Sequence, residues 1–212
     1  MTNRPPAEPS LRERKKRETR QRISDVASGL FQRRGFDQVT VAEVARAADV
    51  STMTVFNYFP RKEDLFLDRI PEAVETFTAA VRGRAPGERP LAALLRLGLD
   101  LLERRHPLSG VGENFGHFCQ VVLDSPALRA RGREGLEELE AALAGALAAT
   151  APEEPDPRLT AALAVAAYRT VCAASVRRLM AGEPVDEVAE GHRLRLTAAF
   201  EALDRAFPPP AP

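Results

Sequence analysis

Residues 40–62, TVAEVARAADVSTMTVFNYFPRK, contain two short segments of helical periodicity joined by a tight junction at residues 49–51. Thr40 and Glu43 have the spacing of a capping box, in which each side chain satisfies a free amide of the other residue at the start of a helix. Ser51 is a favoured N-cap for the second segment. Two helices joined by about three residues, the second apolar on its inner face and polar on its outer face, are typical of a helix-turn-helix. This stretch constrains the fold more than any other.

The periodicity of the second segment divides its side chains between two faces. We expect Val55, Phe56 and Phe59 to point into a small core. The outer face would then carry a mainly polar set, Thr52, Met53, Thr54, Asn57 and Tyr58. An outer face of this kind can enter the major groove of DNA, where side chains contact base edges.

The zero net charge of the chain conceals an asymmetry between its two parts. Residues 1–62 hold 13 Lys and Arg against 7 Asp and Glu, whereas residues 63–212 hold 17 against 23. Most of the basic excess lies just before the first apolar stripe, at Arg12, Arg14, Lys15, Lys16, Arg17, Arg20 and Arg22. A basic segment beside a helix-turn-helix favours contact with DNA phosphates or the minor groove. The alternative is a solvated first turn of a helix.

The run Gly35–Phe66, GFDQVTVAEVARAADVSTMTVFNYFPRKEDLF, resembles the DNA-binding domain of the TetR family of transcriptional regulators. It has the family's glycine before the second helix, the threonine that opens that helix and the Ala-x-x-Ala-x-Val-Ser turn. It also has the ending Tyr/Phe-x-Tyr-Phe-Pro-x-Lys-Glu. The resemblance covers roughly residues 15–66, and the rest of the chain is compatible with the family by length and helical content.

The resemblance implies roles for individual residues of this domain. Base contact is implied for Thr52, Met53 and Asn57. Phosphate contact is implied for Thr40, Thr54, Tyr58 and Lys62. We also expect phosphate contact from three residues of the basic segment, Arg14, Lys15 and Arg17. Phe56 stands where the family commonly has tyrosine and, lacking the hydroxyl, is interpreted as a core residue. The second segment has no arginine, which disfavours strong reading of guanine from it.

The rest of the chain has helical periodicity, so we predict an all-α fold. Residues 11–62 form a three-helix, helix-turn-helix DNA-binding domain. Residues 63–207 form a larger helical domain for effector binding and dimerisation. Residues 1–10 form a disordered tail, and residues 208–212 form a second tail.

The predicted helix over residues 159–180 has apolar side chains on more than one face, and the last predicted helix, from Val185 onward, has one apolar stripe, so that the pair keeps a second apolar face. Such a pair can be covered by the same pair of a second subunit, or it can fold into the core of its own chain. The family resemblance favours a homodimer through these two helices.

The family resemblance also implies a small-molecule effector. Polar and aromatic candidates for its site share one short predicted helix: Asn114, Phe115, His117, Phe118 and Gln120. Phe115 and Phe118, spaced i and i+3, are more often residues of an ordinary core, which is the alternative. The stretch SPALRARGREGLEELEAAL resembles the subgroup with acyl-CoA-like ligand-binding domains, and Arg129 and Arg133 could meet a ligand phosphate there. A solvated helix face is the alternative for these arginines. We expect a small apolar or amphipathic effector, with an acyl-CoA-like molecule as one option.

Several other classes of function are disfavoured. Cys119 and Cys172 have no paired spacing, and the histidines form no zinc-ligand pair with them or with each other. A Gly-rich phosphate loop and a Gly-x-Ser-x-Gly elbow are also absent from the sequence. We therefore expect no enzyme activity, no metal and no cofactor. The polar, proline-rich N-terminus and the lack of a long apolar run predict a cytoplasmic protein without a membrane partner.

Together these observations predict a repressor that binds double-stranded DNA at a pseudo-palindromic operator as a homodimer and is released by a ligand. The rival interpretation from another class is a small-molecule or acyl-CoA sensor or carrier. Such a protein would act through protein partners without sequence-specific DNA binding.

Overall fold

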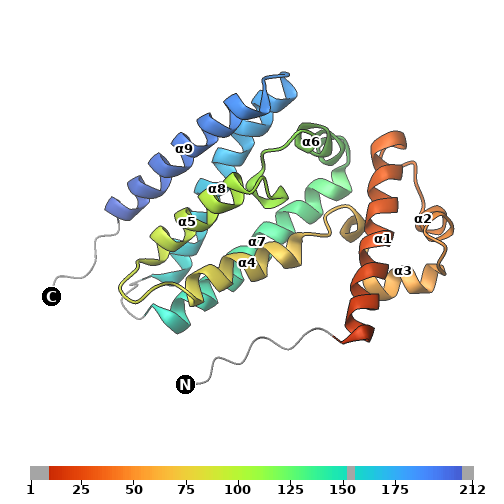
Figure 1. Ribbon diagram of the computed structural model, residues 1–212, viewed down its shortest axis with the longest axis horizontal. Coiled ribbons are helices and arrows are strands. Elements are labelled where there is room, and N and C mark those ends of the chain that lie inside the picture. Colours follow the sequence, from red (N-terminus) through yellow and green to blue (C-terminus); the bar gives the residue numbers. More distant parts are fainter. Residues whose placement is uncertain (1–9, 152–155, 207–212) are drawn as a thin grey trace. The chain divides into compact units, whose positions relative to one another are not determined.

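The computed structural model describes residues 10–151 and 156–206. Over these ranges the regular structure consists of helices and contains no strand (Figure 1), so the predicted all-α class is confirmed. The predicted tails, residues 1–10 and 208–212, lie outside the described residues except for Ser10.

The chain divides into two compact units, Met1–Asp68 and Arg69–Pro212, which are called here the first and the second unit. The first unit contains three α-helices and one short 3₁₀ helix, namely α1 (Leu11–Arg34), α2 (Val41–Ala47), α3 (Thr52–Tyr58) and η1 (Glu63–Leu65).

Local hydrogen bonds define both ends of α1. At its start the Ser10 side chain accepts from the Glu13 amide, and the Glu13 carboxylate accepts from the Ser10 amide. Ser10, expected in the tail, is therefore the N-cap of α1. The helix ends at Gly35, whose φ of 82° is a backbone conformation that suits glycine.

Aromatic side chains form the core of the first unit. The Phe31 ring is fully buried, 4.9 Å from the Phe36 ring centroid and 5.8 Å from that of Phe66. Leu65 and Phe66 are both buried. The first unit therefore continues to Asp68, past the boundary expected after Lys62, because η1 adds these apolar side chains to its core.

The second unit is a bundle of six α-helices and one 3₁₀ helix within the described ranges. They are α4 (Ile70–Arg82), α5 (Pro90–Glu103), η2 (Pro107–Ser109), α6 (Phe115–Asp124), α7 (Pro126–Thr150), α8 (Pro157–Met180) and α9 (Val185–Ala206). Helix α7 packs against α4 and α8, and α9 packs against α5 and α8. Pro71 lies in the first turn of α4, where a missing amide costs no helical hydrogen bond.

A glycine allows α7 to approach the start of α4 closely. A Cβ built on Gly135 would lie 2.7 Å from Ile70 Cδ1 and 3.0 Å from Ile70 Cγ1. These distances are shorter than van der Waals contact, so any larger residue at position 135 would force the Ile70 side chain to shift.

Helix α8 is the most apolar long helix among the described residues. By length and composition alone it could cross a membrane, which is weak evidence because the core helix of a soluble protein meets the same criterion. Only 33% of its most apolar window is buried within the single chain.

Candidate DNA-binding surface and effector cavity

The turn between α2 and α3 is closed by backbone hydrogen bonds. The Val50 amide donates to the Ala45 carbonyl at 3.0 Å, and the Asp49 amide donates to the Arg46 carbonyl at 3.2 Å. Asp49 has a φ of 53°, a left-handed conformation that aspartate adopts more readily than most other residues. These contacts join the two helices as the helix-turn-helix pattern predicted.

The start of α2 is held by the predicted capping box. The Glu43 amide donates to Thr40 Oγ1 at 3.2 Å, and the Glu43 carboxylate accepts from the Thr40 amide at 2.8 Å. Arg34 donates to the same carboxylate at 2.9 Å. The Thr40 amide, followed by Arg34, lowers the pKa of Glu43 to about 2. This carboxylate is therefore charged over the whole physiological pH range.

Two buried side chains set the rotation of α3 about its axis. Val55 and Phe59 are fully buried in the core of the first unit. Each helical residue turns by about 100°, so Met53 and Asn57 point away from that core and Phe56 lies on its flank. Met53 and Phe56 are 69% and 44% exposed, respectively. The interpretation of Phe56 as a core residue is therefore wrong.

Several of the predicted phosphate-contacting side chains already have partners within the first unit. Thr54 Oγ1 lies 2.8 Å from Ser51 Oγ, and Thr40 Oγ1 donates to Glu43 at 2.9 Å. Tyr58 is half-buried, whereas Thr52 and Asn57 are exposed. Thr52 and Asn57 are thus the polar residues of α3 that are most available to a partner.

Lys62 connects the end of the helix-turn-helix to the segment that follows α1. Its Nζ donates to the Phe36 carbonyl at 2.7 Å and lies 4.1 Å from the centroid of the Phe36 ring. Burial lowers the pKa of Lys62, an effect opposed by the nearby carboxylates of Asp37, Glu63 and Glu43. An ammonium has three donors, so this contact leaves others for a phosphate.

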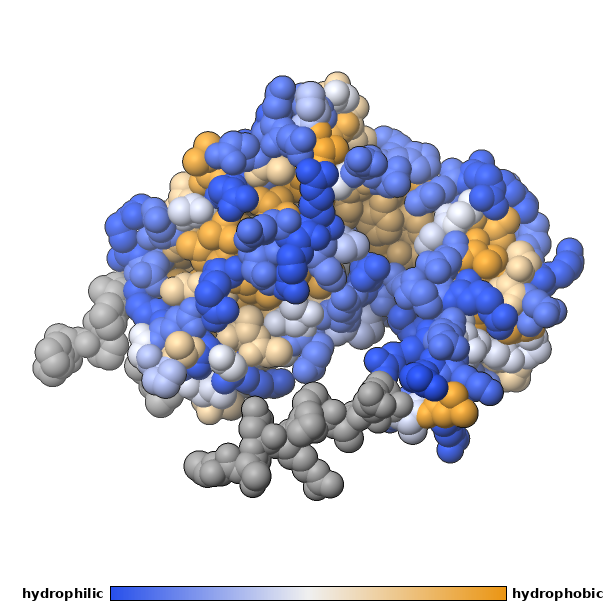
Figure 2. All heavy atoms as spheres, in the orientation of Figure 1, coloured by the Kyte–Doolittle hydropathy of each residue, from blue (hydrophilic) through white to orange (hydrophobic). Residues whose placement is uncertain are grey.

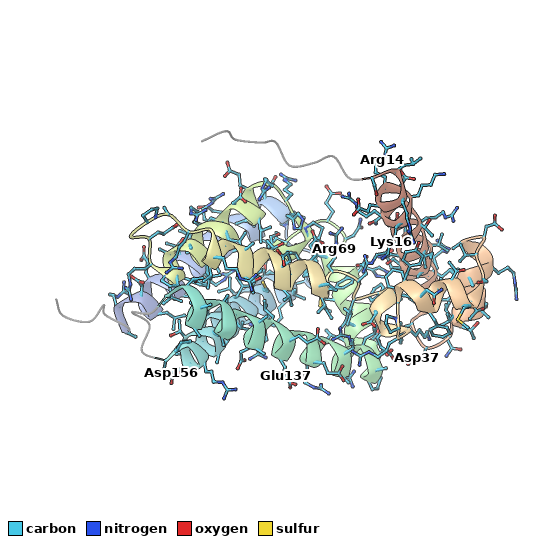
Figure 3. The ribbon with its side chains drawn as sticks, turned by 90° about the horizontal axis from the view of Figure 1, so that it is seen from below. Arg14, Lys16, Asp37, Arg69, Glu137 and Asp156 are labelled. Atoms are coloured by element: carbon cyan, nitrogen blue, oxygen red, sulfur yellow. The ribbon has the colours of Figure 1, made fainter. Side chains whose placement is uncertain are left out.

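The N-terminal half of α1 is a basic, exposed surface. Figure 3 shows Arg14 and Lys16 extending from this part of the helix. The side chains of five consecutive or nearly consecutive basic residues are exposed: Arg12, Arg14, Lys15, Lys16 and Arg17. In Figure 2 most of the visible face of the first unit is hydrophilic.

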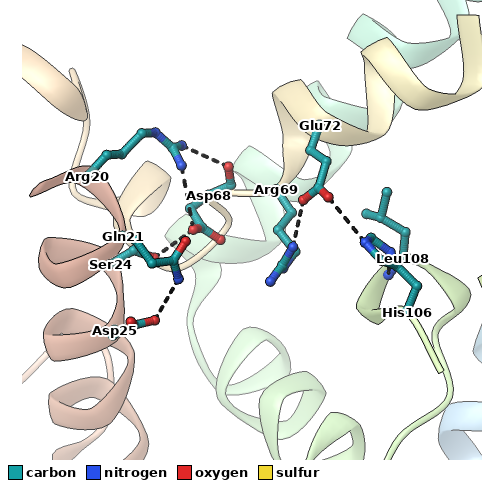
Figure 4. Close-up of polar contacts among 9 residues, drawn as sticks. All are labelled: Arg20, Gln21, Ser24, Asp25, Asp68, Arg69, Glu72, His106 and Leu108. Atoms are coloured by element: carbon teal, nitrogen blue, oxygen red, sulfur yellow. Dashed lines mark hydrogen bonds and ion pairs between the residues drawn. The ribbon is translucent and has the colours of Figure 1, made fainter. Parts of the chain in front are cut away.

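Asp68, the last residue of the first unit, is held against α1 (Figure 4). Ser24 Oγ donates to its carboxylate at 2.7 Å, and Arg20 Nη2 donates to its carbonyl at 2.9 Å. The Arg20 guanidinium also lies 4.7 Å from the centroid of the Phe59 ring. The chain therefore leaves the first unit from a position tied to α1.

The second unit contains an apolar cavity of about 190 Å³ that is partly open to solvent. Its lining comes from α4, α5, α7, α8 and α9: Phe77, Leu94, Leu136, Leu139, Leu143, Ala164, Val165, Tyr168, Arg169, Cys172 and Phe200. A mainly apolar lining favours an apolar occupant.

The predicted effector residues lie elsewhere. His117 and Gln120 line a more open pocket between α6 and the end of α8. Phe115 and Phe118 stack on each other with ring centroids 5.6 Å apart, and Asn114 is exposed. Arg129 donates to the Leu123 carbonyl, and Arg133 is exposed. None of these seven residues lines the apolar cavity.

Two side chains that line the cavity also bind η2. Tyr168 Oη donates to the Leu108 carbonyl at 3.0 Å, and Cys172 Sγ donates to the Ser109 carbonyl at 3.6 Å. Burial raises the pKa of Tyr168 and raises that of the Cys172 thiol to about 12, so both groups stay protonated donors. Any movement of these two side chains would therefore disturb their hydrogen bonds to the backbone of η2.

The residue before η2 contacts the first turn of α4. The Leu108 amide donates to His106 Nδ1 at 3.2 Å, and His106 Nε2 lies 3.2 Å from the Glu72 carboxylate. Glu72 also accepts from Arg69 at 2.7 Å (Figure 4). Because His106 Nδ1 accepts, Nε2 carries the proton that faces Glu72.

A sequence model described as "Bacterial regulatory proteins, tetR family" matches residues 23–68. The HTH-type transcriptional regulator TcmR of Streptomyces glaucescens is 33% identical over 169 residues, which are 78% of this chain and 75% of that protein.

The chain belongs to the TetR family of transcriptional regulators. It is accordingly a DNA-binding regulator. Solved structures of other family members agree with its fold. The SmeT–triclosan complex has a TM-score of 0.58 at 18% identity and covers 92% of this chain and 96% of its own. FadR from Bacillus subtilis in complex with stearoyl-CoA has a TM-score of 0.54 at 21% identity and covers 85% of this chain and 97% of its own.

Sequence reasoning missed the cavity of this TetR-family regulator. The cavity lining combines side chains from five helices, and each has the spacing of an ordinary core residue. One available signal was Tyr168, a phenol within the Ala- and Val-rich helix α8. A buried tyrosine hydroxyl needs a hydrogen-bond partner, so its presence indicates a specific contact. Among the described residues, no group of three or more His, Cys, Asp or Glu could hold a metal ion.

We predict that Lys62→Met destabilises this TetR-family regulator. The variant keeps most of the apolar stem but loses the hydrogen bond to Phe36 and the contact of the ammonium with the aromatic ring. The free energy of unfolding should fall by about 1–2 kcal/mol, measured by urea denaturation. Lys16→Met, at an exposed position of α1, is the matched control and should leave it unchanged. Equal stability of both variants would show that Lys62 does not hold the unit together.

Proposed function

We propose that this TetR-family regulator is a repressor that binds a pseudo-palindromic operator as a homodimer and leaves it when a small apolar effector binds. The observation that carries the proposal is the solvent-facing side of α3, held by Val55 and Phe59, in the same unit as the exposed basic half of α1. In a homodimer the two α3 helices would enter successive major grooves, roughly 34–36 Å apart.

Within this interface the side chains divide by role. Thr52, Met53 and Asn57 read base edges, since all three are exposed on α3. Arg14, Lys15 and Arg17 bind phosphates and supply sequence-independent affinity. Thr40, Thr54, Tyr58 and Lys62 are proposed to add phosphate contacts through the donors that their internal hydrogen bonds leave over.

The rival function, a sensor that acts through protein partners without reading DNA, is not favoured. The five basic residues Arg12, Arg14, Lys15, Lys16 and Arg17 are exposed at the start of α1. A unit released from DNA would have no physical need for this concentration of charge.

The effector is proposed to be small and apolar. The cavity is lined mainly by Leu, Phe, Ala and Val side chains, and its volume of about 190 Å³ is below the roughly 300–1,000 Å³ usual for drug-sized ligands. A larger ligand would have to open the bundle. An acyl-CoA is less well supported, because Arg129 and Arg133 do not line the cavity. Two structural neighbours are complexes with triclosan and with stearoyl-CoA, which makes both useful probes.

Effector binding is proposed to act through η2 on the first turn of α4. An occupant of the cavity would displace Tyr168 and Cys172, which bind the carbonyls of Leu108 and Ser109. Displacement of η2 would also move His106, the residue before it. Glu72 of α4 would follow, because its carboxylate contacts His106 Nε2. Because α4 continues covalently from Asp68, which is tied to α1, this shift favours one orientation of the DNA-binding unit over another.

The homodimer is proposed to form through α8 and α9. The two helices pack on each other, and Ser175 Oγ lies 3.0 Å from the buried His192 Nδ1 between them. Their outer faces keep large apolar side chains in solvent, with Leu194 63% exposed. Covering these faces with a second copy would bury them. A regulator acting on DNA in this way would work in the bacterial cytoplasm.

The assignment of phosphate and base contacts predicts two different mutant phenotypes. Arg14→Ala should weaken binding to all sequences. It should also reduce the slope of log K against the logarithm of the salt concentration by about one unit, the loss of one phosphate contact. Asn57→Ala should change the preferred base at one operator position, at a cost of about 1–3 kcal/mol for the original base. Selection from a random duplex pool followed by fluorescence anisotropy measures both. An Asn57→Ala consensus identical to that of the wild type would refute the base contact.

Filling the cavity should abolish the effector response without affecting DNA binding. Ala164 is buried and lines the cavity, so the added side chain of Ala164→Leu would occupy the space. We expect naphthalene, triclosan or a molecule of similar apolarity to raise the Tm of the wild type but not that of the variant. If stearoyl-CoA raised the Tm of both proteins equally and apolar aromatics raised neither, the effector would bind outside this cavity.

A charge on the outer face of α9 should break the homodimer. Leu194→Glu places a carboxylate where we expect apolar contact with the second subunit, so the variant should be monomeric by light scattering. It should bind a full operator at least tenfold more weakly, since the two reading helices are no longer coupled. Leu11→Glu, at an exposed leucine of α1, is the control for oligomeric state. A dimeric Leu194→Glu protein would exclude this surface as the interface.

A further inference from the structure

The outer face of α3 carries two large apolar side chains. Phe56 follows Met53 by three positions, and side chains at this spacing lie on the same face of a helix. Together with Leu11, they are the large hydrophobic residues exposed in the described part of the first unit. A single exposed apolar residue is ordinary, but two adjacent ones on a helix of seven residues form a local apolar surface.

The packing of α3 keeps the Phe56 ring in solvent. Val55 and Phe59 are both buried, and they lie one residue before and three residues after Phe56. Rotating Phe56 inward would bring Val55 and Phe59 out of the core. The exposure of Phe56, 44% of its surface, therefore follows from its position on α3.

The same face has a limited capacity for polar recognition. Helix α3, TMTVFNY, has no charged side chain, and the Thr54 hydroxyl is hydrogen-bonded to Ser51. Thr52 and Asn57 remain as exposed polar groups. A face with two polar and two large apolar groups would read DNA partly through apolar contact.

In the major groove of B-DNA, the apolar group presented by a base edge is the C5-methyl group of thymine. It projects from the groove floor at the depth where a recognition helix lies. We propose that Met53 and Phe56 are specificity-determining residues that recognise thymine C5-methyl groups. This inference rests on the proposed placement of α3 in the major groove, and it assigns Phe56 to the reading surface of the protein.

The test removes the methyl group alone. An operator consensus is first selected with the full-length protein from a random duplex pool, and each thymine is then replaced in turn by deoxyuridine. Base pairing and all hydrogen-bonding groups are unchanged by this replacement. At one or two positions per half-site we expect affinity to fall about fourfold, the loss that corresponds to one buried methyl group.

A double-mutant cycle connects the methyl group to the side chain. Phe56→Ala should bind the thymine operator more weakly and lose sensitivity to deoxyuridine at one of these positions, and Met53→Ala should do so at a neighbouring position. Phe56→Tyr keeps the ring and should keep the sensitivity. Leu11→Ala, which removes another exposed apolar side chain of the first unit, should also keep it. Because both α3 residues are exposed, we expect each variant to retain the Tm of the wild type.

The outcomes separate this inference from the proposed function. A clear consensus whose affinity does not change with deoxyuridine at any thymine would leave DNA binding intact and overturn methyl recognition. Equal sensitivity in wild type and Phe56→Ala would overturn the role of Phe56. Failure to select any consensus would overturn the proposed operator binding and this inference with it, and would indicate that the apolar face meets a protein partner.

Discussion

Burial of Phe31 is the contact on which the first unit depends. The ring touches Phe36 from the segment after α1 and Phe66 from the segment after α3. The Lys62 ammonium lies over the rings of both Phe31 and Phe36 and donates to the Phe36 carbonyl. The beginning and the end of the helix-turn-helix are thereby fastened to one site on α1. A reading helix of only two turns has little stability of its own, so its orientation comes from this core.

The second unit differs from the first in that the packing of its core is incomplete. The cavity between five helices has lost the dispersion contacts that a filled core would have, and an apolar occupant would restore them. We propose that the same space gives this regulator affinity for a ligand. Tyr168 and Cys172 line the cavity and bind η2, so the cavity lining and the backbone of η2 are connected through two hydrogen bonds.

A short polar chain leads from η2 to the end of the first unit. His106 faces Glu72, Glu72 accepts from Arg69, and the preceding residue, Asp68, is bonded to Ser24 and Arg20 (Figure 4). Gly135 of α7 packs against the side chain of Ile70, the first residue of α4. We propose that a small displacement of η2 moves the first turn of α4 as a whole element, because packed side chains around it deform little.

The sequence by itself determined the features that depend on neighbours along the chain. The Thr40–Glu43 capping box, the Ser51 N-cap and the stop at Gly35 are local hydrogen-bonding and φ requirements, and each is present. The all-α class follows from helical periodicity, and the motif around residues 35–66 is specific enough to identify the family. These inferences succeeded because no distant residue is needed to satisfy them.

Only the tertiary structure decided which side of α3 faces solvent and where the second unit leaves space. Phe56 looked like a core residue because aromatic side chains are usually buried, but the burial of Val55 and Phe59 turns it outward. The cavity lining comes from five helices spread over more than half of the chain. Periodicity assigns the apolar residues of this lining to inner faces of their helices, but it does not show that these faces fail to fill the space between them. That outcome depends on how far apart the helices pack, which no single helix specifies.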